Sequence, residues 1–523
     1  MATNIEFAVS RIASVNPATG EVLGELDGAG PTEVRAAVAR ARAAQPDWNA
    51  CGIRHRIQVL RRFQQILLAR KADVARHITQ EAGKPVAEAL VTEVLVVLDA
   101  ARFLINNAFA ILREVKLPHG NPALKAKSGR ILHEPYGVVG IISPWNYPFS
   151  IPASEALAAL VVGNAVVLKP SELTPLIALE LRALLREAGV PDDIFQVLPG
   201  EGATGAALVG SEIDKLVFTG SVATGRRIAQ IAAERLLPVV LELGGKDPML
   251  VLEDADVDVA SSGAVWGAFV NAGQACLSVE LCYVHRSLYP AFLDACCEKA
   301  RKLRVGNGMD PSTEIGPLIH ERQVRVVESQ VEDAKQRGAR VLAGGARLHE
   351  IGPTFFAPTV LADVDRTMRV MREETFGPLL PIMPFGDDGE AVRLANDSDY
   401  GLAASIWTRD RARGEHLARQ INAGTVMVND AVSCFSISEA PHGGVKSSGL
   451  GRTHGRWGLD EMVRVKYVDS DLLPRMKKIW WFGYGGGFAA EMESFLDLLF
   501  ARPLREKLIA GVRSAGALWR KKL

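Results

Sequence analysis

The spacing of hydrophobic positions changes along this chain. Residues 33–46 and 53–82 repeat apolar side chains at helical spacing, with Arg and Glu on the outer faces. From about residue 138, short apolar runs alternate with helical segments. The runs are 138–142, 165–168, 194–197, 216–218 and 239–241, and the helical segments lie around 151–162, 175–188, 203–209 and 222–236. Short runs without a polar face are typical of buried parallel strands, so the alternation predicts a doubly wound α/β sheet.

A second α/β series begins after Gly245. Its strands are expected at 249–252, 282–284, 341–343, 404–407 and 425–428. A chain of 523 residues is too long for one ordinary core, so more than one domain is expected. We place the main domain boundary at Gly245.

Composition and charge narrow the class of protein. Hydrophobic residues make up 48% of the chain and charged residues 23%, which is typical of a globular protein and excludes disorder. Lys plus Arg equals Asp plus Glu, at 60 each, so the whole-chain charge argues against nucleic acid as the main partner.

Cysteine usage and targeting signals favour a cytoplasmic protein. The 6 cysteines form no CxxC pair or His–Cys cluster, which indicates a reducing compartment, no disulfide framework and no metal site. The N-terminus lacks the basic and apolar regions of a signal peptide. No apolar run is expected to reach the ~18 residues that cross a bilayer.

Two strand-to-helix turns contain residue types that are typical of nucleotide binding. In residues 218–225, FTGSVATG, glycines let backbone N–H groups approach a pyrophosphate at a helix N-terminus. A plain turn explains this motif equally well. In KPSE, Lys169 and Glu172 can hydrogen-bond both hydroxyls of an adenosine ribose, although alone the motif is more often a solvated helix start. No GxGxxG follows the first strand of the sheet.

Cys276 is a candidate nucleophile at the end of NAGQAC, residues 271–276. A free cysteine is usually a small buried hydrophobe, and Glu242, Asn146 and Glu374 each have an equally plain structural explanation as strand, turn or loop residues. Their order and joint presence with the glycine turns favour a covalent redox enzyme.

At these motifs the sequence resembles the aldehyde dehydrogenase superfamily, over roughly residues 14–468. The motifs are SPWNYPF (143–149), KPSE (169–172), FTGSVATG (218–225), LELGGK (241–246), GQAC (273–276), EETFGP (373–378) and GGVKSSGLGR (443–452). The resemblance implies a Rossmann-like cofactor domain without GxGxxG, an α/β catalytic domain and a small β oligomerisation arm. The implied parts are 1–117 with 137–244 for NAD binding, 245–446 for catalysis, 118–136 with 455–470 for the arm, and 471–523 for a C-terminal tail.

The resemblance also assigns roles to residues. Cys276 would attack the aldehyde carbonyl, while the Asn146 amide and the Cys276 N–H hold the oxyanion. Glu242 would activate water to hydrolyse the thioester. The cofactor, NAD with NADP as the alternative, would contact Ser143, Trp145, Lys169, Glu172, Gly202, Gly220, Ser221, Gly225, Leu243, Glu374 and Phe376. A carboxylate at Glu172 repels a 2′-phosphate and so favours NAD.

Two features bear on the reaction and the substrate. Acyl-transferring relatives lack a carboxylate at the position of Glu242, so its presence favours hydrolysis to a free acid. A semialdehyde substrate would call for an Arg in the pocket, and the pocket loop 431–440, AVSCFSISEA, has none. We therefore expect an uncharged aldehyde, with semialdehyde oxidation and a catalytically silent structural relative as alternatives. A homodimer or homotetramer is expected.

The tail beyond residue 470 departs from the family pattern. It clusters aromatic residues beside Lys477 and Lys478, and then places apolar residues at helical spacing in 492–500 and 504–519. From 471 to 523 there are ten Lys and Arg against five Asp and Glu, a net charge of +5. This pattern predicts a weak peripheral membrane contact. Fatty-aldehyde members of the family also have C-terminal hydrophobic extensions, so the resemblance implies an apolar, long-chain or aromatic aldehyde. Packing on a partner subunit or over a substrate tunnel is the competing interpretation, because apolar helical stripes usually pack.

Overall fold

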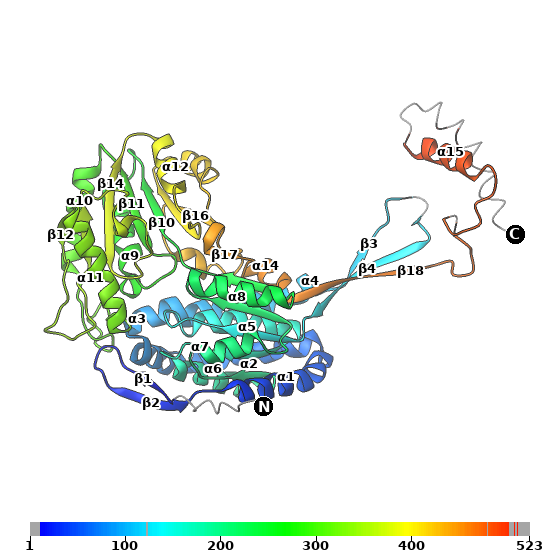
Figure 1. Cartoon of the computed structure of the whole chain (residues 1–523), viewed down its shortest axis with the longest axis horizontal. Helices are drawn as coiled ribbons and strands as arrows, with labels where there is room; N and C mark the ends of the chain where they lie inside the picture. The colour runs from blue at the N-terminus through cyan, green and yellow to red at the C-terminus, as the bar shows by residue number, and fades with distance from the viewer. Residues whose placement is uncertain (1–10, 122–123, 479, 501–506, 508–509, 511–523) are drawn as a thin grey trace, which may run out of the picture. The chain divides into compact units, whose positions relative to one another are not determined.

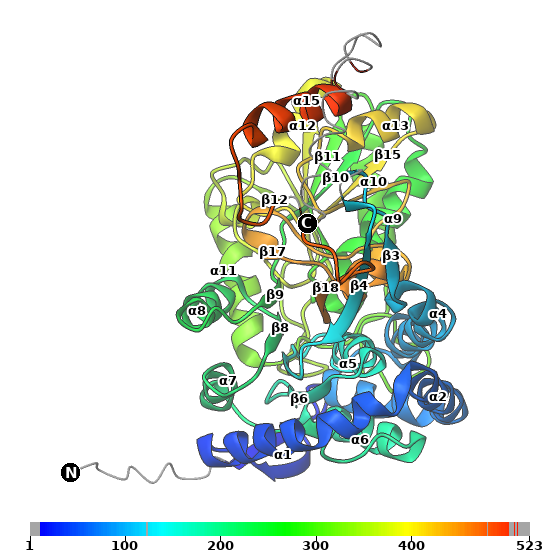
Figure 2. The same cartoon turned by 90° about the vertical axis from the view of Figure 1, so that its right-hand side faces the viewer.

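The computed structural model describes residues 11–121, 124–478, 480–500, 507 and 510. Contacts divide the chain into two units, one formed by Met1–Leu112 with Glu134–Arg464 and one by Arg113–His133 with Val465–Leu523. The first unit contains two large, mainly parallel sheets with helices on their faces (Figures 1 and 2). The expected mixed α/β fold with a Rossmann-like sheet is confirmed.

The first large sheet has six strands in the order β17-β9-β8-β5-β6-β7. All neighbours are parallel except β17, which runs antiparallel to β9. Each parallel strand coincides with an apolar run expected from the sequence. The strands are β5 (Val138–Ile142), β6 (Ala165–Lys169), β7 (Phe195–Val197), β8 (Lys215–Thr219), β9 (Val239–Glu242) and β17 (Gly449–Leu450).

Helices cover both faces of this sheet (Figure 1). Several end on a glycine with a left-handed backbone, as α5 does at Gly163, where φ is 111°. The N-terminus of α8 is capped by Ser221, whose Oγ accepts a hydrogen bond from the Thr224 N–H. The helices are α1 (Pro31–Ala50), α2 (Gly52–Ala82), α3 (Val86–Ala89), α4 (Leu95–Leu112), α5 (Ser150–Val162), α6 (Pro175–Ala188), α7 (Gly202–Val209), α8 (Val222–Glu234) and α14 (Gly455–Asp460).

One helical segment corrects the expectation about membrane-spanning length. Val86–Leu112, which joins α3 and α4 through a π turn, is the one helix in the described part of the chain that is long and apolar enough to cross a bilayer. It contains four charged residues, Glu88, Glu93, Asp99 and Arg102. About half of its most apolar window, 50%, is buried inside the protein, where α4 packs against α2 and α5.

The second large sheet has seven strands in the order β12-β13-β14-β11-β10-β15-β16. The chain moves into it after β9, across residues 243–246. Its strands are β10 (Asp247–Val251), β11 (Val279–His285), β12 (Arg340–Ala343), β13 (Thr359–Ala362), β14 (Leu379–Phe385), β15 (Ala403–Trp407) and β16 (Thr425–Val428). Its helices are α9 (Val257–Phe269), α10 (Tyr289–Lys302), α11 (Glu321–Gln336), α12 (Asp388–Asn396) and α13 (Arg411–Ala418). A hairpin of β1 (Arg11–Val15) and β2 (Val22–Asp27) precedes both sheets.

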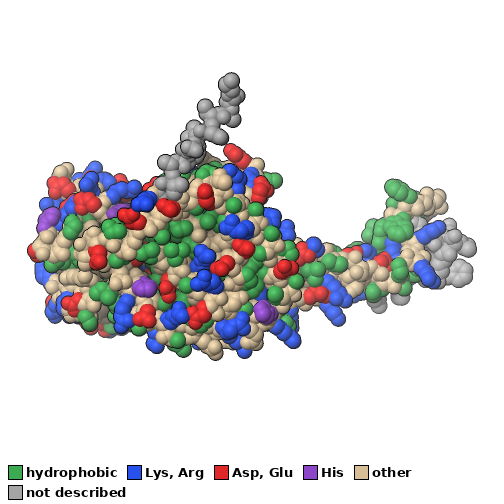
Figure 3. Space-filling model, turned by 90° about the horizontal axis from the view of Figure 1, so that it is seen from below, with side chains coloured by type: hydrophobic (Ala, Val, Ile, Leu, Met, Phe, Trp, Pro, Cys, Tyr) green, Lys and Arg blue, Asp and Glu red, His purple; other side chains and the backbone are tan. Residues whose placement is uncertain are grey.

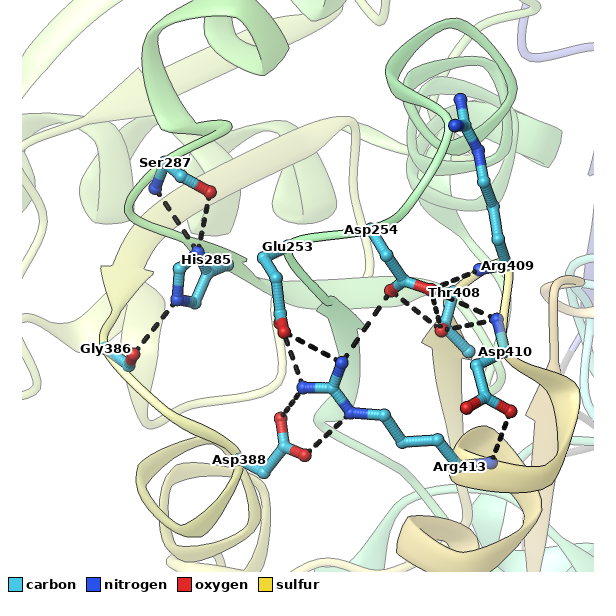
Figure 4. Close-up of polar contacts among 10 residues, drawn as sticks. All are labelled: Glu253, Asp254, His285, Ser287, Gly386, Asp388, Thr408, Arg409, Asp410 and Arg413. Atoms are coloured by element: carbon cyan, nitrogen blue, oxygen red, sulfur yellow. Dashed lines mark hydrogen bonds and ion pairs between the residues drawn. The ribbon is translucent and has the colours of Figure 1, made fainter.

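Arg413 ties the end of β10 to two helices of this part (Figure 4). Its guanidinium donates to both oxygens of Glu253, at 2.8 and 2.9 Å, and to both oxygens of Asp388, at 2.6 and 2.8 Å. Two bidentate pairs on one guanidinium fix its orientation. They hold α12 and α13 together beside the end of β10.

The second unit contains a three-stranded sheet in the order β18-β4-β3, and the helix α15 (Phe488–Phe500). Its strands are β3 (Val115–Leu117), β4 (Lys127–Pro135) and β18 (Val463–Asp471). Two expected boundaries are corrected here. Residues 115–117, assigned to the cofactor domain, pair with β4 in this sheet, and residues 455–460, assigned to the arm, form α14, which packs on α4 and α5.

In the tail, α15 covers the first of the two helical segments expected from the sequence. The second, at 504–519, lies outside the described residues except for 507 and 510. The expected aromatic cluster is exposed, with Phe482 at 94% and Trp481 at 53% relative exposure. On the face drawn in Figure 3, basic and acidic side chains are interspersed.

Candidate active site

Four of the candidate residues stand where neighbouring strands of the six-stranded sheet end. Lys169 and Glu242 close β6 and β9, while Ser143 and Gly220 directly follow β5 and β8. The Ser143 N–H donates to the Lys169 carbonyl at 3.1 Å, and the Gly220 N–H donates to the Glu242 carbonyl at 3.0 Å. Ligands of doubly wound sheets bind at this carboxyl edge.

The residues expected to hold the adenosine and pyrophosphate line up along that edge. Lys169 lies 3.3 Å from the Glu172 carboxylate, and burial lowers the pKa of Lys169 while Glu172 raises it. Gly202 begins α7, with open space where a side chain would start. A Cβ on Gly225 would lie 2.5 Å from a Leu243 methyl carbon, so a larger residue there would have to displace the Leu243 side chain.

Glu374 and Phe376 approach from the other sheet. Trp145 meets Phe376 edge-on, with ring centroids 5.4 Å apart. The Glu374 carboxylate accepts from the Gly245 N–H at 3.2 Å. Burial, with Glu280 nearby, raises the pKa of Glu374 to about 8. This carboxyl group is therefore protonated over much of the neutral range and able to donate a hydrogen bond.

Cys276 follows a strained turn. Asn271 and Ala272 both have left-handed backbones, with φ of 53° and 55°, a conformation that non-glycine residues adopt at a cost of ~1–3 kcal/mol each. Hydrogen bonds hold the turn. The Asn271 N–H donates to Glu88 at 3.1 Å, and the Gln274 amide oxygen accepts from the Ile319 N–H at 2.9 Å.

The electrostatics around Cys276 favour the protonated thiol. Burial raises the pKa of Cys276 well above its usual range, and Asp247, Glu242 and Glu374 raise it further. A thiol surrounded by carboxyl groups attacks a carbonyl only after it loses its proton. Deprotonation therefore requires a nearby base or positive charge when the reaction begins.

Asn146 and the Cys276 turn share hydrogen bonds. The Asn146 side-chain amide donates to the Gln274 carbonyl at 3.0 Å, and the Asn146 carbonyl accepts from the Asn271 amide at 2.9 Å. A buried ion pair supports the same loop, because Lys84 donates to both Glu93 and the Asn146 carbonyl at 2.8 Å. Sequence reasoning missed this pair, since a Lys and a Glu nine positions apart carry no signal without the fold.

Glu242 is buried, and neither of its carboxylate oxygens has a hydrogen-bond partner among the described residues. A histidine lies beside it, with Nε2 of His442 3.7 Å from Glu242 Oε2. Burial and Glu155 raise the pKa of Glu242 well above its usual range, while Arg452 lowers it. Sequence reasoning did not single out His442, although it directly precedes the closing GGVKSSGLGR motif.

A cavity of about 300 Å³ joins these groups. Of the expected site residues, its lining contains Trp145, Asn146, Gly220, Ser221, Glu242, Leu243, Cys276, Glu374 and Phe376. The other five, at the same sheet edge but outside the lining, are Ser143, Lys169, Glu172, Gly202 and Gly225. The lining also contains groups that the sequence did not reveal, among them Phe103, Leu104, Glu155, Phe435, His442, His454, Leu459 and Met462. The fold and this cavity are those of a nucleotide-dependent dehydrogenase.

Comparisons with known proteins specify the family. The aldehyde dehydrogenase family profile matches residues 6–468. A 4,4'-diapolycopene aldehyde oxidase from Methylomonas sp is 40% identical over 495 residues, 94% of this chain and 92% of the relative. The NAD+ complex of an aldehyde dehydrogenase from Bacillus cereus has a TM-score of 0.85 at 36% identity, covering 88% of this chain and 94% of that one. A succinate-semialdehyde dehydrogenase structure from Burkholderia pseudomallei has a TM-score of 0.85 at 37% identity, covering 88% and 95%.

The chain belongs to the aldehyde dehydrogenase family. It is an oxidoreductase that acts on an aldehyde group with NAD or NADP.

Proposed function

We propose that this protein oxidises an apolar aldehyde to the carboxylic acid with NAD, through a thioester on Cys276 that water hydrolyses. The observation that carries the proposal is the cavity itself. It brings Cys276, Asn146 and Glu242 together beside the carboxyl edge of the cofactor sheet. The expected cofactor-binding residues at and beside this edge, among them Lys169 and Phe376, fit a dinucleotide. NAD would supply the acceptor for a hydride.

The chemistry assigned to the chain's own residues has two halves. In the first, the Cys276 sulfur loses its proton and bonds to the aldehyde carbon, and the Asn146 amide and the Cys276 N–H hold the oxyanion. Loss of a hydride from that carbon leaves a thioester. In the second half, Glu242 takes a proton from water as the oxygen attacks the thioester carbonyl. The tetrahedral adduct then releases the carboxylic acid and the Cys276 thiolate.

The cavity lining supports an apolar substrate. Among the described residues that line it, none is Lys or Arg, which a distal carboxylate would need for a buried ion pair. One wall is formed by Phe103, Leu104, Phe435, Leu459 and Met462. The relative named for diapolycopene aldehyde favours the same class of substrate. Succinate semialdehyde, named for another relative, is the second candidate.

A substrate panel tests this assignment. We expect kcat/KM for linear and aromatic apolar aldehydes to exceed that for succinate semialdehyde by at least about tenfold, because an unpaired carboxylate in the cavity costs more than ~1.4 kcal/mol. NADH absorbance with C2 to C18 aldehydes, benzaldehyde and succinate semialdehyde measures this. A higher kcat/KM for succinate semialdehyde would contradict the apolar assignment and leave the reaction class unchanged.

Cofactor preference follows Glu172. We expect a KM for NAD at least a few-fold below that for NADP, since the Glu172 carboxylate repels a 2′-phosphate. Glu172 is partly exposed, so the repulsion is screened to about 1 kcal/mol, or roughly fivefold. Glu172→Gln should narrow the preference by that factor, measured as the KM ratio at constant ionic strength. Glu180→Gln on the neighbouring helix is the control. Equal use of both cofactors by the unaltered protein would refute the inference.

We propose that the C-terminal tail, residues 471–523, makes a weak contact with a membrane surface. Trp480, Trp481 and Phe482 are exposed, and α15 follows them with an exposed Phe500. Inserting apolar surface into a lipid interface contributes ~25 cal/mol per Å², and each basic residue near anionic lipid adds ~1 kcal/mol.

Co-sedimentation with anionic liposomes, comparing the full chain with a 1–470 truncation, tests the tail assignment. We expect binding by the full chain that weakens with salt and is lost on truncation. A chain that binds no liposomes, and whose truncation instead dissociates a homodimer or homotetramer in size-exclusion chromatography, would assign the tail to subunit packing.

A further inference from the structure

His442 and His454 form a buried pair of rings beside Glu242. The backbones of His442 and Thr453 pair in both directions, at 2.8 and 2.9 Å, and this bridge brings the two histidines together. Their ring centroids lie 5.7 Å apart. Phe435 packs edge-on against both rings, at 5.0 Å from His442 and 4.6 Å from His454. All three side chains line the cavity that contains Cys276.

Unpartnered polar atoms concentrate at this place. Within the described residues, both oxygens of Glu242, Nδ1 of His442 and Nε2 of His454 are buried without a hydrogen-bond partner. Buried polar groups in this state cost ~1–3 kcal/mol each. A cluster of them in a cavity is explained more readily by function than by packing, because phenylalanine would fill the same space without that cost.

The environment of Glu242 contains charges of both signs. Glu155 on α5 and Glu461 at the end of α14 disfavour its ionisation, and Arg452 favours it. His442 faces His454 and Arg452, and burial keeps the pKa of His442 near 3. At neutral pH the imidazole is therefore uncharged, with one N–H to donate. Because the described part of the chain offers the Glu242 carboxylate no other hydrogen-bond partner, a small rotation is free to close the 3.7 Å gap to His442 Nε2.

The carboxylate is already confined on the other side. A Cβ on Gly443, the next residue, would lie 2.8 Å from Glu242 Oε1. The Gly443 backbone, with φ of 150°, therefore lies directly against the carboxylate, and His442 and Gly443 together form its immediate surroundings along this segment of the chain.

We propose that His442 is a positioning residue, which donates a hydrogen bond from Nε2 to the Glu242 carboxylate and holds it in the ionised form that accepts a proton from water. Glu155 acts in the opposite direction, because it accepts a hydrogen bond from the Thr219 hydroxyl at 3.3 Å and its like charge disfavours ionisation of Glu242. The inference rests on the proposed role of Glu242 as the base for thioester hydrolysis.

Two variants matched in length isolate the hydrogen bond. His442→Gln keeps an N–H donor and His442→Met lacks one, while His442→Phe preserves the ring that packs on Phe435. His416→Gln, at an exposed histidine on α13, is the control. The readouts are the NADH burst, the steady-state rate, and the pH at which the rate rises to half its plateau.

We expect His442→Met and His442→Phe to retain the burst and to lose steady-state rate near neutral pH by about 10- to 100-fold. A hydrogen bond to a charged group is worth about one to two pH units, and its loss disfavours the carboxylate. The rising limb should therefore move to higher pH by that amount, with recovery of the rate above it. His442→Gln should restore most of the shift, and His416→Gln should behave as the unaltered protein.

An unshifted limb in both His442→Met and His442→Phe would overturn the proposal, even if the rate fell, because the role would then be structural. If His442→Phe does not fold, the Gln and Met pair still decides the question. Glu242→Gln distinguishes a failure of the base assignment of Glu242 from a failure of the positioning role of His442. If it turns over normally, the base assignment itself fails, whereas a stalled Glu242→Gln with an unshifted His442→Met refutes only the role of His442.

Discussion

Replacing Cys276 by serine is expected to lower NADH formation by about 10³-fold or more. A serine hydroxyl is a far weaker nucleophile than a thiolate, and the carboxyl groups around Cys276, which already raise the pKa of the thiol, disfavour an alkoxide more strongly. Initial rates with NAD and a saturating apolar aldehyde measure the loss. Cofactor affinity, followed by fluorescence titration, should stay unchanged because the substitution alters one atom.

Cys51→Ser is the matched control for this experiment. Cys51 is an exposed free cysteine between α1 and α2 and does not line the cavity. Its replacement should leave the rate unaltered. Retention of more than a tenth of the activity by Cys276→Ser, with a normal Cys51→Ser, would show that the covalent route does not run through Cys276.

Replacing Glu242 by glutamine is expected to separate the two halves of the reaction. The proposed role of Glu242 is confined to hydrolysis, so a burst of about one NADH per subunit should remain. Hydrolysis loses its general base, which typically contributes ~10²–10⁴-fold, and the steady rate should fall accordingly. Rapid-mixing absorbance at 340 nm resolves the burst, and intact mass should show the acyl group on the protein.

The pH dependence of the unaltered protein should agree with this assignment. Burial and Glu155 raise the pKa of Glu242, and only its deprotonated form accepts a proton from water. Steady-state turnover should therefore rise with pH through a limb above the range of an ordinary glutamate, while the burst does not follow that limb. Turnover of Glu242→Gln at the unaltered steady rate would assign hydrolysis to another group.

The parallel core was predictable because its strands are short, uniformly apolar and separated by helices. The run at 138–142 coincides with β5, and 175–188 coincides with α6. Two strands of the seven-stranded sheet, β13 and β14, were missed. For β14 the reason is physical, because it contains Pro381 and Pro384, which lack an N–H and usually exclude a central strand.

The site residues were predictable where they belong to contiguous motifs, and nine of the expected ones line one cavity. The groups that surround Glu242 were not predictable from the sequence. Glu155 lies inside a helix that reads as purely apolar, and His454 follows the last motif rather than belonging to it. Their proximity to Glu242 depends on how β17 returns to the sheet, which no local spacing encodes.

The hydrogen bonds between Asn146 and the Asn271–Gln274 turn have a mechanical consequence. Asn146 follows a strand of the six-stranded sheet, and the turn leads into a strand of the seven-stranded sheet. These reciprocal bonds join the two sheets next to Cys276, so any hinge motion that opens the molecule to exchange cofactor must occur elsewhere. Heating should consequently abolish activity and both sheets in a single cooperative step, with no inactive intermediate in which one sheet survives alone.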